Sequence, residues 1–433
     1  MPTGRGKDQI VNRACVAAIA LIILVAIPAC GSEPADPCFK SLPAGWTITE
    51  SHVIPDDQTA AIGRKLGVGI TKLSNTYLSA QGKPIQANIM EATTDADAAK
   101  LYEAILRMKN GNSAFCLRKG LRVVEYVVNG NDNAAGTALA TKTSYELGFV
   151  PKPKQVSYHV SARLAAVDKA DYMALTKLFN LFLGMNADAP GKESLAELEA
   201  ATRLFRFGQS VTMRSPTVGK PESAYAFKPA PESEKDNGET ITYSFAKLPE
   251  MHGVPYVAAE LDITTNEDGL TPSTRKADAA LLAATEFWPA RDPEITQLAG
   301  TITTGKTTRE SKVQAILAWL QPGRNIKYGG PVVGSLYGVK QVLKQKYGRC
   351  WDFSDCFVTL CRASGIPCRQ VAGWLYGSEG HVWAEVLVEG KGWQQFDATG
   401  GRCGIYYIPY FATDTGDMPI LYLAMPEIRI KEN

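Results

Sequence analysis

Apolar residues recur at helical spacing in some segments and alternate with polar residues in others, so the chain is predicted to mix helices and strands. Thr94 to Lys109 carries apolar side chains three or four positions apart behind a polar N-cap, which predicts a helix. Gln155 to Val167 alternates between apolar and polar residues, as a half-buried strand does. Residues 191–280 are richer in strand patterns and turns. The predicted fold class is therefore α+β.

The same patterns divide the chain into consecutive parts. Helical periodicity returns after Pro272, in Asp278 to Trp288, Asp292 to Ala299 and Arg309 to Leu320. Three short strands with Gly-rich turns follow. The predicted parts are a signal peptide (1–29), a lipidated Cys and tether (30–45), an α+β domain without an assigned role (46–190), a mostly β segment (191–280), a domain bearing the candidate chemistry (281–415) and a C-terminal tail or strand (416–433).

The first thirty residues have the pattern of an export signal. Basic residues precede an uncharged stretch, Ala14 to Ile27, which is too short for a membrane span. Pro28-Ala29-Cys30 follows and resembles a bacterial lipobox, although Pro28 departs from that pattern. The alternative is an ordinary signal peptide cleaved after Ala29. The lipobox interpretation predicts an exported, membrane-anchored lipoprotein that carries its lipid on Cys30 and faces the periplasm or the cell exterior.

Charge and cysteine content narrow the class of protein. The 433 residues include 46 Lys and Arg against 44 Asp and Glu, and removal of residues 1–29 leaves 43 of each. This balance argues against nucleic-acid binding, which needs a basic face. If one cysteine beyond Cys30 is catalytic, six remain, which is compatible with three disulfides in an oxidising compartment. Cys38 with Cys116 is the favoured pair, and the alternative is that several cysteines are buried free thiols.

One motif matches a nucleotide-binding loop but lacks the surrounding structure. Gly300 to Thr307 reads G-x-x-x-x-G-K-T, the phosphate-loop pattern. That loop needs a buried strand directly before it, whereas Asp292 to Ala299 is amphipathic and helical. We therefore predict a helix–loop–helix connection and no bound nucleotide.

The candidate chemistry begins at Cys350. Apolar residues with helical spacing follow it, among them Phe353 and Phe357, and they place Cys350 in the first turn of a helix. The unpaired N–H groups of a helix N-terminus favour the thiolate, which is the nucleophilic form of cysteine.

A His and an Asp follow with matching strand parity. In His381 to Val388 the small apolar residues occupy one face of the predicted strand, and His381, Trp383 and Glu385 occupy the other. Asp397 on the next strand has the parity to lie opposite His381 or one diagonal step away. Cys350, His381 and Asp397 could thus act as nucleophile, base and orienting acid. A zinc site formed by His381 and the clustered cysteines is the alternative that we do not favour.

Four blocks in this order resemble the transglutaminase-like superfamily: G-R-C-W-D-F-S, L-C-R-A-S-G-I-P-C-R-Q-V-A-G-W, H-V-W-A-E-V and G-W-Q-Q-F-D-A-T. The resemblance runs from about Phe287 to Tyr410. It implies a papain-like core in which a Cys-bearing helix packs against an antiparallel sheet. It also implies that Cys350 is the nucleophile, His381 the base and Asp397 the orienter, with no metal or organic cofactor.

These features predict a thiol acyl-transfer enzyme that acts on a peptide or protein at the cell envelope. Cys350 would form a thioester, which either water resolves (a peptidase or amidase) or an amine resolves (a cross-linking acyltransferase). The predicted partners are this substrate and the membrane that holds the lipid on Cys30. The alternative is a surface-anchored binding or scaffold lipoprotein with an inactive core.

Overall fold

The structure, a computed structural model, describes most of the chain after residue 45. The chain divides into two units between Lys152 and Pro153. Within the described residues no helix has the length and apolar character needed to cross a membrane. The predicted leader, Cys30 and Cys38 lie outside the described residues. These are 46–80, 83–108, 116–128, 151–167, 201–214, 225–269, 273, 275–331, 335–376, 380–418, 420–424 and 426–431, with isolated residues in 137–145, 171–175 and 197–200.

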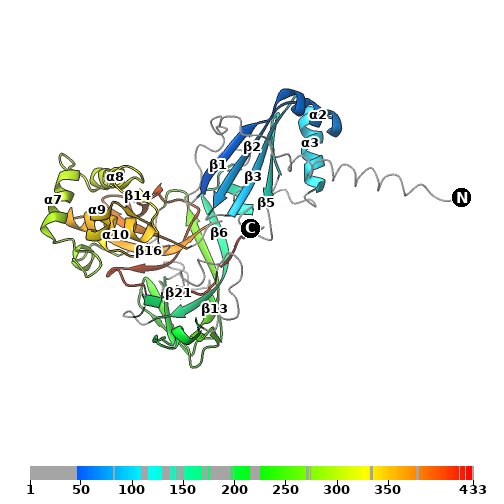
Figure 1. The fold of residues 1–433 in the computed structure, drawn as a ribbon. Helices are drawn as coiled ribbons and strands as arrows, with labels where there is room; N and C mark the ends of the chain where they lie inside the picture. The colour runs from blue at the N-terminus through cyan, green and yellow to red at the C-terminus, as the bar shows by residue number, and fades with distance from the viewer. Residues whose placement is uncertain are drawn as a thin grey trace. The chain divides into compact units, whose positions relative to one another are not determined.

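The first unit is built on an antiparallel sheet with the strand order β1-β2-β3-β5-β4, against which two helices pack (Figure 1). The apolar stripe of the second helix, including Leu101 and Ile105, packs with Met90 and Val123 of the sheet. The side chain of Thr94 accepts a hydrogen bond from the Asp97 N–H, which caps this helix at the predicted place. The elements are β1 (Trp46–Val53), α2 (Asp56–Leu66), β2 (Ile70–Ala80), β3 (Lys83–Ala92), α3 (Asp95–Met108), β4 (Cys116–Lys119) and β5 (Arg122–Val128).

The second unit begins with a sheet in the order β21-β6-β13-β8, and β22 also pairs with β6. β6 pairs with β13 from Gln155 to Leu164, so it belongs to this unit. The division therefore lies after residue 152 rather than near residue 190. The strands of this part, which also include a β7-β10-β9 sheet and a short hairpin, are β6 (Gln155–Ala166), β7 (Ser210–Arg214), β8 (Tyr225–Lys228), β9 (Ser233–Asp236), β10 (Thr240–Ser244), β11 (Glu250–Met251), β12 (Val254–Pro255), β13 (Val257–Asn266), β21 (Ile420–Tyr422) and β22 (Glu427–Ile430).

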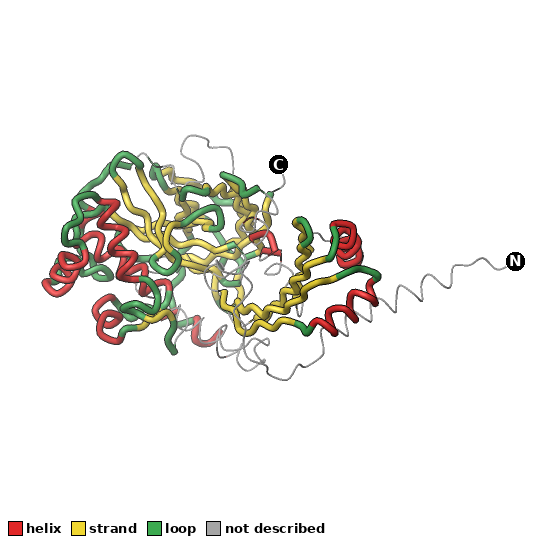
Figure 2. Tube along the Cα trace, turned by 90° about the horizontal axis from the view of Figure 1, so that it is seen from above, coloured by secondary structure: helices red, strands yellow, loops and turns green. Residues whose placement is uncertain are grey.

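Helices and an antiparallel sheet in the order β19-β18-β17-β16-β20 form the rest of the second unit. Figure 2 shows these helices gathered on one side of the strands. The elements are η3 (Ala280–Leu282), α7 (Pro293–Ile302), α8 (Arg309–Leu320), β14 (Lys327–Tyr328), α9 (Val339–Gln345), β15 (Tyr347–Gly348), α10 (Cys350–Ala363), β16 (Cys368–Leu375), β17 (Gly380–Val388), β18 (Gly392–Asp397), β19 (Gly401–Arg402) and β20 (Tyr407–Thr413).

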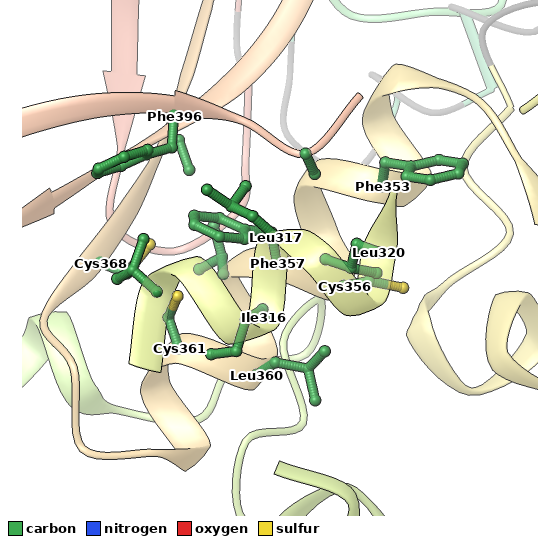
Figure 3. Close-up of a cluster of buried hydrophobic side chains, with 14 of the residues drawn as sticks. Ile316, Leu317, Leu320, Phe353, Cys356, Phe357, Leu360, Cys361, Cys368 and Phe396 are labelled. Carbon is green, nitrogen blue, oxygen red and sulfur yellow. The ribbon is translucent and has the colours of Figure 1, made fainter. Parts of the chain in front are cut away.

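The core between α10 and the sheet follows the predicted strand parity. Phe357 of α10 packs with Leu317 of α8 and with Phe396 of β18 (Figure 3). Ala384 and Val386 of β17 also belong to this core. The alternation predicted for His381 to Val388 therefore matches the structure. The opposite face of β17 carries His381 and Glu385 beside Trp383, which packs in a second, smaller apolar cluster.

The phosphate-loop motif has no strand before it. α7 starts at Pro293 with the Asp292 side chain accepting from the Glu294 N–H, and it continues to Ile302. Gly300 therefore lies in the last turn of a helix, and α8 follows after a short loop. The motif is a helix–loop–helix connection, as predicted.

The helix predicted from Asp278 to Trp288 is wrong, because only the 3₁₀ turn η3 forms there. The segment lies along α10 in an irregular conformation. The Trp288 indole donates to Asp355 at 2.9 Å, and the Arg362 guanidinium donates to the Ala283 carbonyl at 2.7 Å. The apolar spacing reflects these contacts with α10 rather than a helical backbone.

The expectation of three disulfides is also wrong for the described cysteines. Cys356, Cys361, Cys368 and Cys403 are free thiols, which leaves too few cysteines for three disulfides. Cys116 is buried in the core of the first unit, and its predicted partner Cys38 lies outside the described residues. Cys361 and Cys368 lie side by side as free thiols that share a hydrogen bond (Figure 3). Burial raises the pKa of Cys361 and Cys403 well above the ordinary value, so these thiols are inert core residues.

Candidate active site

Cys350 is the first residue of α10 and is half-buried. The helix start is fixed by Asp352, whose carboxylate accepts from the Arg349 N–H at 3.0 Å. The same carboxylate accepts from the Ser335 hydroxyl and the Tyr337 N–H. The Asp352 carboxylate therefore caps the helix and ties the preceding loop to it. These contacts orient the turn that carries Cys350.

His381 and Asp397 meet across β17 and β18. The register pairs Ala384 with Phe396, and its continuation places Asp397 one diagonal step from His381. His381 Nε2 lies 2.8 Å from Asp397 Oδ2. His381 also shares a hydrogen bond with Cys350. The structure thus brings the three predicted site residues together, with His381 between the thiol and the carboxylate.

The electrostatics of the pair favour its charged form. Burial by itself lowers the pKa of His381, but the charge and hydrogen bond of Asp397, together with Cys350, raise it well above its usual value. Burial raises the pKa of Asp397, but the His381 charge and several hydrogen bonds lower it overall. An imidazolium beside a carboxylate is therefore the expected state near neutral pH.

Asp397 is held by donors on both of its oxygens. Oδ2 accepts from His381 and from the Tyr407 hydroxyl, the latter at 3.0 Å. Oδ1 accepts from the Thr399 N–H and hydroxyl, both at 2.7 Å. The sequence analysis missed Thr399 and Tyr407. An Asx turn in D-A-T could have indicated Thr399, whereas no local pattern pointed to Tyr407.

Tyr328 is a further residue at the site that the sequence analysis did not single out. β14 pairs in parallel with β15, which ends two residues before Cys350, and this pairing brings the Tyr328 hydroxyl within hydrogen-bond reach of the thiol. Burial first, and then the charge of Cys350, raise the pKa of Tyr328. Its hydroxyl therefore stays protonated and can donate to the sulfur.

Tyr328→Phe is expected to slow alkylation of Cys350 at pH 6 by about 10-fold, because the thiolate loses a hydrogen bond from a neutral donor. The rate is measured by mass spectrometry of the Cys350 peptide. Tyr337→Phe is the matched control, since the buried Tyr337 hydroxyl meets no hydrogen-bond partner among the described residues. Equal rates for the two variants would contradict this role of Tyr328.

Comparison with known proteins identifies the class of this core. Residues 296–398, which include Cys350, His381 and Asp397, match the profile of the transglutaminase-like superfamily. The second unit therefore contains a region similar to the transglutaminase-like core, within an α+β fold. No curated protein matches the sequence.

Solved structures with similarity to the chain include bacterial proteins of related description. A candidate cysteine protease from Cytophaga hutchinsonii is 15% identical, over 64% of this chain and 89% of that one, with a TM-score of 0.37. The periplasmic domain of TgpA from Pseudomonas aeruginosa is 14% identical, over 57% and 88%, with a TM-score of 0.28. A structure described as a TGase is 16% identical, over 36% and 43%, with a TM-score of 0.20.

Proposed function

We propose that the protein is a cell-envelope thiol acyl-transfer enzyme that acts on an amide group of a peptide or protein. The observation that carries the proposal is the hydrogen-bonded series Cys350–His381–Asp397 inside the family-matched core. Each residue has the neighbour that its role requires: a nucleophile next to a base, and a base held by a buried carboxylate.

The reaction follows from these contacts. His381 holds the proton of the Cys350 thiol, and the thiolate adds to the amide carbonyl carbon. The tetrahedral intermediate collapses when His381 gives its proton to the leaving amine, which breaks the C–N bond and leaves a thioester on Cys350. Water or a second amine then attacks the thioester as His381 removes its proton. The proton returns to the thiol as the acid or the new amide leaves.

The start of α10 suits the charge that develops on the substrate oxygen. The first N–H groups of a helix have no partner within the helix, and Cys350 stands at this position. These groups, together with the hydroxyl of Tyr328, would donate to the oxyanion next to the attacked carbon.

The location at the envelope is supported by the leader pattern before Cys30. We propose that a lipid on Cys30 anchors the protein to the membrane and that the substrate is a peptide or protein met at that surface. More than one acyl chain on this residue would make the anchoring stable.

The test uses the processed full-length protein in detergent with glutamine-containing peptides and a labelled primary amine. We expect wild-type protein to accumulate an acyl group on the Cys350 peptide after an acid quench. Amine incorporation marks a cross-linking enzyme, whereas deamidation or new peptide termini mark a hydrolase. Cys350→Ala is expected to lose all products, and Cys356→Ala, which removes a buried thiol of the same helix, is expected to keep them. No acyl group and no product with the wild-type protein would contradict the proposal.

A further inference from the structure

The Tyr407 hydroxyl and the His381 imidazole hydrogen-bond to the same carboxylate oxygen, Asp397 Oδ2. Tyr407 is the first residue of β20, an edge strand that reaches the site from the far side of β16. Its hydroxyl donates to Asp397 Oδ2 at 3.0 Å, and His381 Nε2 lies 2.8 Å from the same atom. A change at the Tyr407 hydroxyl therefore acts directly on the atom that holds the imidazole.

The surroundings of Tyr407 hold its hydroxyl in this place. The ring packs edge-on against Trp383, with centroids 5.3 Å apart. A turn in which the Tyr407 N–H donates to the Gly404 carbonyl fixes the backbone. A Cβ atom at Gly400 would lie 2.8 Å from the Tyr407 hydroxyl and 3.0 Å from Asp397 Oδ2. The absence of a side chain at Gly400 thus leaves room for the contact.

We propose that Tyr407 is a positioning residue of the active site, which limits how strongly Asp397 holds the proton on His381. This inference rests on the proposed function, since it assigns a role within the same site. A second donor on Oδ2 neutralises part of the charge that would otherwise act on the imidazolium. With Tyr407 present, His381 releases its proton more readily to the leaving amine.

Tyr407 acts only as a donor, because burial first, and then the charge of Asp397, raise its pKa well above the ordinary value. Burial likewise raises the pKa of Cys403 and of Tyr328, so neither carries a charge near neutral pH. His381 interacts with Asp397 of β18 and with Cys350 of α10. The other titratable groups around this His381–Asp397 pair are Tyr407 of β20, Tyr328 of β14 and Cys403 before β20.

The test follows the alkylation of Cys350 by iodoacetate against pH in the processed full-length protein. This anionic reagent reacts fastest while His381 is charged, so the rate falls at high pH as the imidazolium loses its proton. Tyr407→Phe keeps the ring contacts and removes only the hydroxyl. We expect this alkaline limb to move upward by about one pH unit, the effect of one hydrogen bond to a charged group, and kcat for acyl transfer to fall while KM stays the same.

Two further variants make the test specific. Gly400→Ala is expected to reproduce the shift by displacing the hydroxyl, and to add nothing when combined with Tyr407→Phe. Tyr337→Phe is expected to leave the profile unchanged. An unshifted alkaline limb in Tyr407→Phe would overturn the inference, provided that His381→Gln abolishes the limb of the wild type. If the wild-type protein shows no limb that depends on His381, the proposed function fails and the inference fails with it.

Discussion

Replacing Asp397 by Asn is expected to lower kcat/KM by about 10³- to 10⁴-fold while the fold is retained. The carboxylate accepts from the Thr399 N–H and hydroxyl on one oxygen, and from His381 and Tyr407 on the other. An Asn side chain has only one acceptor oxygen, and the backbone N–H of Thr399 cannot turn away. The amide NH₂ would then face His381 Nε2 and force the proton onto Nδ1. In that tautomer the imidazole cannot accept the proton of Cys350.

The effect is measured as kcat/KM with the peptide substrate and as the alkylation rate of Cys350 at neutral pH. Asp262→Asn is the matched control, because Asp262 also holds a histidine, with His159 Nδ1 at 2.8 Å, but in the sheet of β6 and β13. We expect this control to keep full activity. An Asp397→Asn variant with more than about a tenth of wild-type activity would exclude the assigned role of the carboxylate.

The largest effect on stability is expected from Glu385→Gln, at about 3–5 kcal/mol. Glu385 is fully buried on β17 and accepts from Arg214 at 2.6 Å and from Arg369 at 2.8 Å. Arg369 also bonds Glu239 and lies over the ring of Trp393, 4.4 Å from its centroid. Removing the charge of Glu385 takes away the carboxylate that pairs with the largely buried Arg214 and leaves Arg369 with Glu239 alone. A loss of this size corresponds to a fall in the melting temperature of about 10 °C.

The measurement is thermal unfolding of the full protein followed by the tryptophan signal. Glu310→Gln removes the charge of a similar but exposed pair, with Lys391 at 2.6 Å and about half of each side chain in solvent. An exposed pair contributes little, so this control is expected to change stability by less than about 0.5 kcal/mol. Equal effects of the two substitutions would show that the buried network does not stabilise the second unit.

The three predicted site residues were accessible to sequence reasoning because each has a strong local signal. Cys350 stands before an apolar helical stripe, and the alternation around His381 fixes which face of β17 it occupies. The step from His381 to Asp397 crosses a single hairpin, so strand parity alone limits the arrangement to adjacent positions. Short-range periodicity therefore sufficed to predict these contacts.

Residues that support the site from distant segments could not be predicted in this way. Tyr407 reaches Asp397 only because β20 pairs with β16 rather than with its sequence neighbour β19. Arg214 of β7 and Glu239 of the turn before β10 reach the sheet of β16 and β17 from far earlier in the chain. Periodicity reports the face that a residue occupies, but it does not report which strands become neighbours. The long-range pairing had to come from the structure.

The failed helix between Asp278 and Trp288 has a related cause. Leu281 and Trp288 are buried, and their spacing imitates one face of a helix. The backbone there hydrogen-bonds to a side chain of α10 instead, because the Arg362 guanidinium donates to the Ala283 carbonyl. Tertiary hydrogen bonds thus override the local pattern.

The pairing of β21 and β22 with β6 affects how the second unit can fold while the chain is being synthesised. β6 is the first described strand of the second unit to leave the ribosome, whereas the two strands that pair with its outer edge lie at residues 420–430. The whole core with Cys350 is made between them. The nascent chain therefore carries an open strand edge until residues 420–430 have been made, which slows folding and invites pairing with other chains. Newly made protein should depend on chaperones that shield such edges until β21 and β22 have paired with β6.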